Sequence, residues 1–230
     1  SPNGTITTAG AAGNLEVGGG TFTVGPYAHT IAGGLTVSSG ALDFGDVGVT
    51  ATTLTIPGAT TVTGGTVTFG SGTATRTLQC NGTFTLSGGT INLTASDAAL
   101  ALTGAGATAA ISGGTLSLGA GTVNRTVTMS SATALTISGT SIIDFGTGAT
   151  GTRKIQCDGS FTRSGGTSFT MDADTLEVLD LNGNATWSGG TVAISGGLIT
   201  CAGNWDDSGF ATAFQPTAGV VRFDRGAGTS

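Results

Sequence analysis

Short runs in which apolar and polar residues alternate follow one another along almost the whole chain. Residues 77–95 show one unit: the alternating segments TLQC, TFTLS and TINLTA are separated by Asn81-Gly82 and Gly88-Gly89. Alternation with a period of two places successive side chains on opposite faces of a strand, so each segment predicts a short strand with one apolar face. Asn and Gly tolerate a positive φ and favour turns. The pattern therefore predicts an all-β chain.

The unit repeats about every 25 residues, and each repeat is marked by a Gly-Gly-Thr motif. The motif occurs at Gly64-Gly65-Thr66, Gly88-Gly89-Thr90, Gly113-Gly114-Thr115, Gly165-Gly166-Thr167 and Gly189-Gly190-Thr191, with a degenerate copy at Gly139-Thr140 and earlier traces at Gly19-Gly20-Thr21 and Ser39-Gly40. A fixed period in this range indicates a repeat architecture in which each unit contacts its neighbours.

Alignment of the repeats places one apolar pair per strand in each of three columns. The first strands contribute Leu54/Ile56, Leu78/Cys80, Ile155/Cys157, Leu179/Leu181 and Ile199/Cys201; the second Thr60/Val62, Phe84/Leu86, Ala109/Ile111, Leu135/Ile137 and Phe161/Arg163; the third Phe22/Val24, Leu42/Phe44, Val67/Phe69, Ile91/Leu93, Leu116/Leu118, Ile143/Phe145, Phe169/Met171 and Val192/Ile194. Three strands per unit, each with one apolar face, predict a right-handed parallel β-helix (β-solenoid) of about nine coils from Leu15 to Phe223. An antiparallel β-sandwich would share the turn spacing but has no reason to repeat its columns.

We interpret residues 1–230 as one solenoid domain. Residues 1–14 are expected to form an N-terminal strand or edge segment, residues 15–199 regular coils, and residues 200–230 a longer, atypical terminal coil. The chain begins at Ser1 rather than Met, which indicates a mature or excised form. The longest apolar run is far too short to span a bilayer, so no membrane insertion is expected.

The composition and net charge of the chain narrow the classes of function to consider. The chain has 43 Gly, 7 Lys and Arg against 13 Asp and Glu, a net charge of −6 and a pI near 4.3. The basic residues are scattered, which argues against nucleic acid as a partner. A weakly charged surface rich in Thr fits an extracellular protein.

The chain has three cysteines, an odd number, and their spacing is not that of zinc ligands. Cys80, Cys157 and Cys201 share one inward column. Three coils separate Cys80 from Cys157, which places them about 14 Å apart at the spacing of neighbouring strands, too far for a disulfide. We expect three buried free thiols that act as small apolar side chains. No cofactor is expected.

The terminal stretch CAGNWDDSGFATAFQPTAGVVRFDRG departs from the repeat. It resembles repeats of very large secreted bacterial surface proteins, of the form GNW-xx-SG-x-F-x-P-x-x-G-x-V-x-F-D-G. The rest of the chain resembles, in composition and period, the β-helical shafts of autotransporter passengers and filamentous-haemagglutinin-like adhesins. The resemblance implies an extracellular structural or adhesive role and carries no catalytic residue.

Several polar residues are candidates for binding. Asp172 and Asp174, in the densest acidic stretch, could offer oxygen ligands to Ca²⁺. The stretch lacks the glycine and the alternating ligands of a known calcium loop, so we favour solvated carboxylates at a corner. Trp187, Trp205, Asp206 and Asp207 could form a carbohydrate surface. Hydrolysis needs two carboxylates at a defined separation, and neighbours along a strand point in opposite directions, so we do not expect an enzyme.

Two further side-chain sets follow the repeat. Arg76, Arg125 and Arg153 stand four residues before the Cys80 column and could line one corner as a weak basic stripe. Exposed arginines that confer solubility and protect a strand edge explain them equally well. Outward Thr residues form ladders on all three faces, which suits exposed strands. A Thr array could also bind ice.

Both ends of the predicted solenoid carry strand-like sequence. Ser1, Pro2 and Ile6 at one end and Val221 and Phe223 at the other are candidate assembly residues, because an uncapped coil exposes unpaired N–H and C=O groups. We therefore expect an extracellular structural protein that is either a subunit of a head-to-tail filament of identical chains or a shaft joined to adjoining solenoid repeats. The alternatives are a polysaccharide-binding or polysaccharide-degrading β-helix protein and an ice-binding or surface-binding module.

Overall fold

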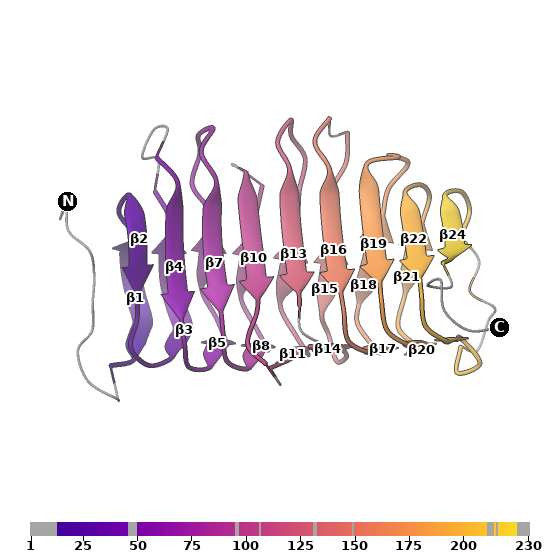
Figure 1. The fold of residues 1–230 in the computed structure, drawn as a ribbon, viewed down its shortest axis with the longest axis horizontal. Helices are drawn as coiled ribbons and strands as arrows, with labels where there is room; N and C mark the ends of the chain where they lie inside the picture. The colour runs from indigo at the N-terminus through magenta and orange to yellow at the C-terminus, as the bar shows by residue number, and fades with distance from the viewer. Residues whose placement is uncertain are drawn as a thin grey trace.

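A computed structural model describes residues 13–45, 50–94, 97–105, 107–130, 133–148, 150–210, 214 and 216–224. These residues form 24 β-strands, and no helix occurs among them. In Figure 1 the strands of one sheet run downward in front, the chain returns behind them, and each coil lies to the right of the preceding one. The winding is therefore right-handed. The prediction of a parallel β-solenoid is confirmed, with about eight turns rather than nine.

The front sheet contains the first strand of each coil. It has nine strands in the order β2 (Tyr27–Thr30), β4 (Thr52–Ile56), β7 (Arg76–Cys80), β10 (Ala98–Leu102), β13 (Arg125–Met129), β16 (Arg153–Cys157), β19 (Glu177–Leu181), β22 (Leu198–Cys201) and β24 (Val220–Phe223). Each strand pairs in parallel with its counterparts in the neighbouring coils, without a register shift. Equivalent residues are therefore neighbours in a column.

The other sheet has 15 strands and contains the remaining two strands of each coil. The second strands are β5 (Thr60–Val62), β8 (Phe84–Leu86), β11 (Thr108–Ile111), β14 (Ala134–Ile137), β17 (Phe161–Ser164), β20 (Ala185–Gly189) and β23 (Trp205–Asp206); the third are β6 (Thr66–Thr68), β9 (Thr90–Asn92), β12 (Thr115–Ser117), β15 (Ile142–Asp144), β18 (Ser168–Met171) and β21 (Val192–Ile194).

The first coils differ from the three-strand prediction. In β1 (Leu15–Thr23) and β3 (Leu35–Asp43) the second and third strands form one long strand. The first part of β3 pairs with β5 and the last part with β6, so this strand joins the two arms of the large sheet. The corner is still present, because Gly20 and Gly40 inside these strands have positive φ angles of 61° and 71°.

The Gly-Gly motif has a steric cause in the later coils. Gly89, the second glycine of its motif, has φ of +69°, and a Cβ added to it would lie 2.5 Å from the carbonyl oxygen of Gly65 in the preceding coil. Gly114 stands in the same relation to the oxygen of Gly89. The corner therefore needs a residue that adopts a positive φ and has no side chain, and only glycine meets both needs.

The core consists of the predicted columns. All the first-strand and second-strand pairs are buried, including Thr60 and Arg163. The third-strand pairs are buried too, except that Phe22 and Val192 near the two ends are half-buried. Stacking of equivalent side chains is direct in places: the rings of Phe44 and Phe69 are parallel, with centroids 4.9 Å apart.

Candidate functional site

A column of charged residues lies inside the solenoid, where the strands of the front sheet begin. The register aligns Thr52, Arg76, Ala98, Arg125, Arg153 and Glu177. The three arginines and Glu177 are at most 1% exposed. The prediction that Arg76, Arg125 and Arg153 line a corner of the surface is therefore wrong. Arg76 stands two residues before Leu78 and four residues before Cys80, and Arg125 and Arg153 have the same spacing from their own buried neighbours. Because side chains alternate along a strand, this even spacing already placed the arginines on the inner face.

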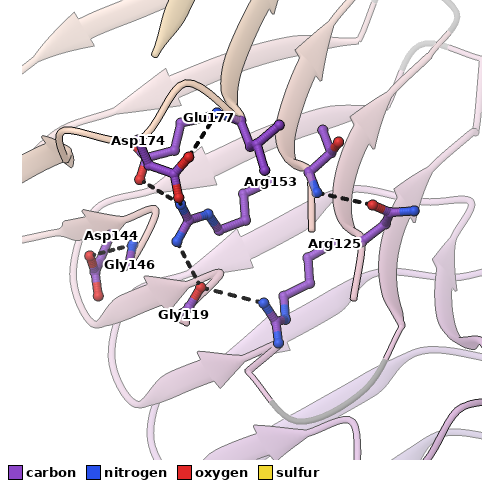
Figure 2. Close-up of polar contacts among 10 residues, drawn as sticks. Gly119, Arg125, Asp144, Gly146, Arg153, Asp174 and Glu177 are labelled. Carbon is purple, nitrogen blue, oxygen red and sulfur yellow. Dashed lines mark hydrogen bonds and ion pairs between the residues drawn. The ribbon is translucent and has the colours of Figure 1, made fainter. Parts of the chain in front are cut away.

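The arginine side chains bind carbonyl groups at the ends of the third strands and in the loops that follow them. Arg125 donates from Nε to Leu93 O at 2.6 Å, from Nη2 to Thr94 O at 2.5 Å and from Nη1 to Gly119 O at 3.4 Å. Arg153 donates from Nη1 to the same Gly119 O at 3.3 Å (Figure 2). Backbone carbonyls of two successive coils are thus held from inside by two guanidinium groups, which supply the hydrogen bonds that buried carbonyls need.

Two carboxylates lie beside Arg153: Glu177 in the same column and Asp174 in the loop before β19. The Nη2 of Arg153 lies 2.7 Å from Asp174 Oδ2 and 3.1 Å from Glu177 Oε1 (Figure 2). Burial raises the pKa of Glu177 to about 8, and the nearby guanidinium of Arg153 opposes this shift. Asp174 also accepts a hydrogen bond from the Leu176 N–H at 3.0 Å. This cluster fixes the loop before β19 to the start of that strand.

The predicted calcium ligands lie at the rim of this cluster. Asp172 and Asp174 border an open groove together with Thr147, Gly148 and Thr175. Among the residues that the structure describes, no three His, Cys, Asp or Glu side chains gather as metal ligands would. Calcium binding there stays a prediction, and a cation would have to compete with Arg153 for Asp174.

Arg163 is a second buried cation, on the inner face of β17. It donates from Nη2 to Thr191 O at 2.7 Å and from Nη1 to Gly189 O, both in the next coil. Its guanidinium carbon lies 5.9 Å from the centroid of the Phe169 ring. Burial lowers the pKa of Arg163 to about 10. Within the described ranges no carboxylate lies within ion-pair distance of it, so Arg163 bridges two coils through carbonyl groups and a ring face.

The predicted carbohydrate surface is not assembled as expected. Trp187 is completely buried, so its assignment to a ligand surface is wrong. Its ring packs against Phe161, Phe169, Trp205 and Phe214, with centroids 4.7–5.6 Å apart. The reason is register: Trp187 pairs with Arg163 and occupies the same inward column.

The other three residues of the predicted carbohydrate surface, Trp205, Asp206 and Asp207, lie in the last coil, at the C-terminal end of the solenoid. Trp205 is half-buried and borders a groove with Asn184, Asn204 and Phe223. Asp206 is exposed and accepts two hydrogen bonds from Ser208, 3.0 Å from its N–H and 2.6 Å from its hydroxyl, which lower the pKa of Asp206. Whether Trp205, Asp206 and Asp207 bind carbohydrate stays a prediction.

The cysteine prediction is confirmed. Cys80, Cys157 and Cys201 are free and buried in one column, separated by Leu102, Met129 and Leu181. Burial raises the pKa of Cys80 to about 12 and that of Cys157 to about 11, and it raises the pKa of Cys201 as well.

The large apolar side chains that remain exposed lie on the end strands of the front sheet. Within the described part of the chain they are Tyr27 on β2, 56% exposed, and Val220 and Phe223 on β24, 56% and 62% exposed. Val221 is half-buried and packs against the core. Ser1, Pro2 and Ile6, the other predicted assembly residues, lie outside the described residues.

No described segment forms a helix that could cross a bilayer. Comparison of the chain with protein families, with curated proteins and with solved structures finds no significant match in any of them.

Proposed function

We propose that the protein is an extracellular structural element, a solenoid shaft that holds what lies at its two ends at a fixed separation. The observation that carries the proposal is the uninterrupted register of the front sheet from β2 to β24, in which the inner coils from β4 to β22 repeat the same buried columns. Solenoids of this kind are stable as stacks of neighbouring coils and present length rather than a single cleft.

The buried charges support the same proposal. Arg125, Arg153 and Arg163 are inside the solenoid and bind backbone carbonyls of neighbouring coils. Their hydrogen bonds tie coils and loops together, which is what a rigid spacer needs. The extracellular assignment rests on the resemblance of the GNWDDSG segment, Gly203 to Gly209, and its continuation to repeats of secreted bacterial surface proteins.

Localisation tests the extracellular part. Immunogold labelling and protease treatment of intact cells that make the protein should find it accessible outside the cell, and label confined to the cell interior would exclude the proposal. An intracellular marker protein serves as the control for intact cells.

Removal of whole coils tests the shaft. Arg76 and Arg125 occupy the same column two coils apart, so deletion of residues 76–124 should leave the register intact and shorten the rod by about 10 Å. Spin labels near the two ends would report the distance. Deletion of residues 79–128 is the matched control, because it removes one residue from within the joined strand, turns the inward Met129 outward and should prevent folding. A folded 76–124 deletion that has lost all biological activity would indicate a specific site on those coils instead.

A second candidate function is binding to a solid periodic surface, and the outer face of the second strands favours it. Seven successive coils each place two small outward side chains there, nearly all of them with hydroxyls: Thr36/Ser38, Thr61/Thr63, Thr85/Ser87, Ala110/Ser112, Thr136/Ser138, Thr162/Ser164 and Thr186/Ser188. Parallel strands space such rows about 4.8 Å apart and the two positions in a row about 6.6 Å apart.

Lysine substitution on this face separates the two functions. Thr85→Lys with Thr136→Lys should abolish adsorption to ice or to insoluble polysaccharide if the face binds either. The matched control is Thr77→Lys with Thr128→Lys, at outward positions of the front sheet. If the unmodified protein adsorbs to neither solid, this second function is excluded.

A further inference from the structure

The last coil ends in a strand whose outer edge has no neighbour among the described residues. β24 pairs on one side with β22, and the register places Val220 beside Leu198 and Phe223 beside Cys201. Phe223 thus continues a column that is buried in every inner coil, yet it is 62% exposed. A strand edge with unpaired N–H and C=O groups and uncovered apolar side chains can accept a further parallel strand.

One outward column on the second strands has acids at its two ends. It runs through Glu16, Thr36, Thr61, Thr85, Ala110, Thr136, Thr162, Thr186 and Asp206. All the residues of this column that lie between Glu16 and Asp206 are uncharged, and both acids are exposed. The charges therefore sit only where another coil would be added.

The register shows what a second copy of the chain would meet. If its β1 were stacked on β23 as the next coil, Leu15 would lie beside Trp205 and Glu16 beside Asp206. The apolar pair would fit, but the two acidic residues would be direct neighbours, with their backbones about 5 Å apart, the spacing of neighbouring strands. Like charges at this distance repel each other, and an opposite charge would attract.

We propose that the C-terminal end of the solenoid is a docking surface for the terminal coil of a different β-solenoid chain, one that carries a lysine or arginine in the column of Asp206, and that Glu16 keeps a second copy of this chain off that surface. This inference rests on the proposed shaft function and names the partner of its C-terminal end. In the proposed complex, a parallel β-strand of the partner covers Val220 and Phe223, and the lysine or arginine of the partner pairs with Asp206.

Charge reversal at the two ends tests the proposal with the full chain as its own probe. Glu16→Lys should allow head-to-tail assembly, because a lysine then meets Asp206, and Asp206→Lys should do the same through Glu16. The double variant opposes two lysines and should again be monomeric. Sedimentation velocity at low salt should show that each single variant associates at least about tenfold more tightly than the unmodified chain or the double variant.

Two controls keep the result interpretable. Circular dichroism and thermal melting check that each variant folds, which is expected because both positions are exposed. Phe223→Asp in the Glu16→Lys background should abolish the assembly, since it alters the proposed docking edge.

Monomeric single variants would overturn the proposal, and so would an unmodified chain that assembles as tightly as Glu16→Lys. Either result is independent of the labelling experiment above. A protein found outside the cell whose single variants stay monomeric would keep the shaft function and lose this docking surface.

Discussion

The middle and the C-terminal coils of this solenoid fill the same interior in different ways. From β7 to β13 the inward columns are largely aliphatic, and the buried cations there bind carbonyl oxygens, as Arg125 does with three of them. From β16 onward the interior contains the Arg153 ion pairs, Arg163 and a cluster of rings around Trp187. The fold is unchanged, and the register is regular throughout the front sheet.

The difference shows what the repeat constrains. An aliphatic column needs only matching size in adjacent coils, so neighbouring units are interchangeable. A buried charge needs a particular partner, and Arg153 finds its carboxylates in the loop before β19 and at the start of that strand. The middle coils are therefore expected to behave as independent layers, whereas the C-terminal coils should respond as a coupled group.

The largest expected effect is a charge placed in a column that has no polar partner. Leu116 on β12 is 2% exposed and lies in a column between Ile91 and Ile143, so Leu116→Asp should lower the free energy of unfolding by at least about 4 kcal/mol. Thr115→Asp, at an outward position of β12, is the control and should cost about 1 kcal/mol or less. Denaturant titration measures both, and equal losses would show that the assigned faces of this strand are wrong.

Removal of one arginine from each region tests the comparison directly. Arg153→Met leaves Asp174 and Glu177 without their buried cation and should destabilise the protein by about 3–5 kcal/mol. Arg125→Met leaves only carbonyl groups unpaired and should cost about 1–3 kcal/mol. If urea unfolding gives the same loss for both, the two regions do not differ in the way their interiors suggest.

The glycine corner should matter in every coil, whatever fills the interior. Gly89→Ala combines a positive φ with a Cβ 2.5 Å from a carbonyl oxygen, and we expect a loss of about 2–4 kcal/mol. Gly148→Ala is the matched control: its φ is +62°, but the added Cβ meets nothing within 4 Å, so the loss should be about 1 kcal/mol. Similar thermal midpoints for the two variants would mean that the stacked corner can relax.

The sequence was sufficient to predict the columns, because a period of two and a repeat of about 25 residues both constrain the register. The sequence was not sufficient to place a side chain whose type suggests the surface but whose position in the repeat faces inward. Arg76, Arg125 and Arg153 were expected at the surface because they are charged, although their spacing from Leu78 and its equivalents placed them inside. Trp187 was expected on a ligand surface with Trp205, Asp206 and Asp207, although it aligns with the inward Arg163.

The cluster around Arg153 could not be predicted from the sequence at all. Asp174 belongs to a corner whose length varies from coil to coil, so no repeat position indicates where its side chain lies. Only the folded loop brings it within 2.7 Å of Arg153. The merged strands β1 and β3 were missed for a related reason, since a glycine with positive φ was taken to end a strand and here lies within one.

Glu177 makes the C-terminal coils sensitive to pH. Its pKa in the folded protein, about 8, lies above the ordinary value of 4.5, so the folded state binds the extra proton between these values. This contribution to stability is complete below about pH 4.5 and is lost as the pH rises through 8. Between pH 5 and 8 the unfolding free energy should therefore fall by up to about 1.4 kcal/mol per pH unit more in the unmodified protein than in Glu177→Gln. Parallel slopes for the two proteins would contradict the assignment.

The smallest effect concerns the thiols, which report how independently the coils open. All three are buried and their pKa values are raised by burial, so a thiol reagent should label almost nothing in the native protein at neutral pH. Low concentrations of denaturant should expose Cys201 first, because β22 is covered on its outer side only by β24, whereas Cys80 and Cys157 lie within the stack. End coils have fewer neighbours and open at a lower free energy.

Mass spectrometry after digestion gives the order in which the three cysteines are labelled, with Cys80→Ala and Cys201→Ala variants to confirm the assignment of each labelled peptide. Labelling of Cys80 as early as Cys201 would mean that the solenoid opens as one cooperative unit, and the contrast between its two regions would then be one of composition without consequence for dynamics.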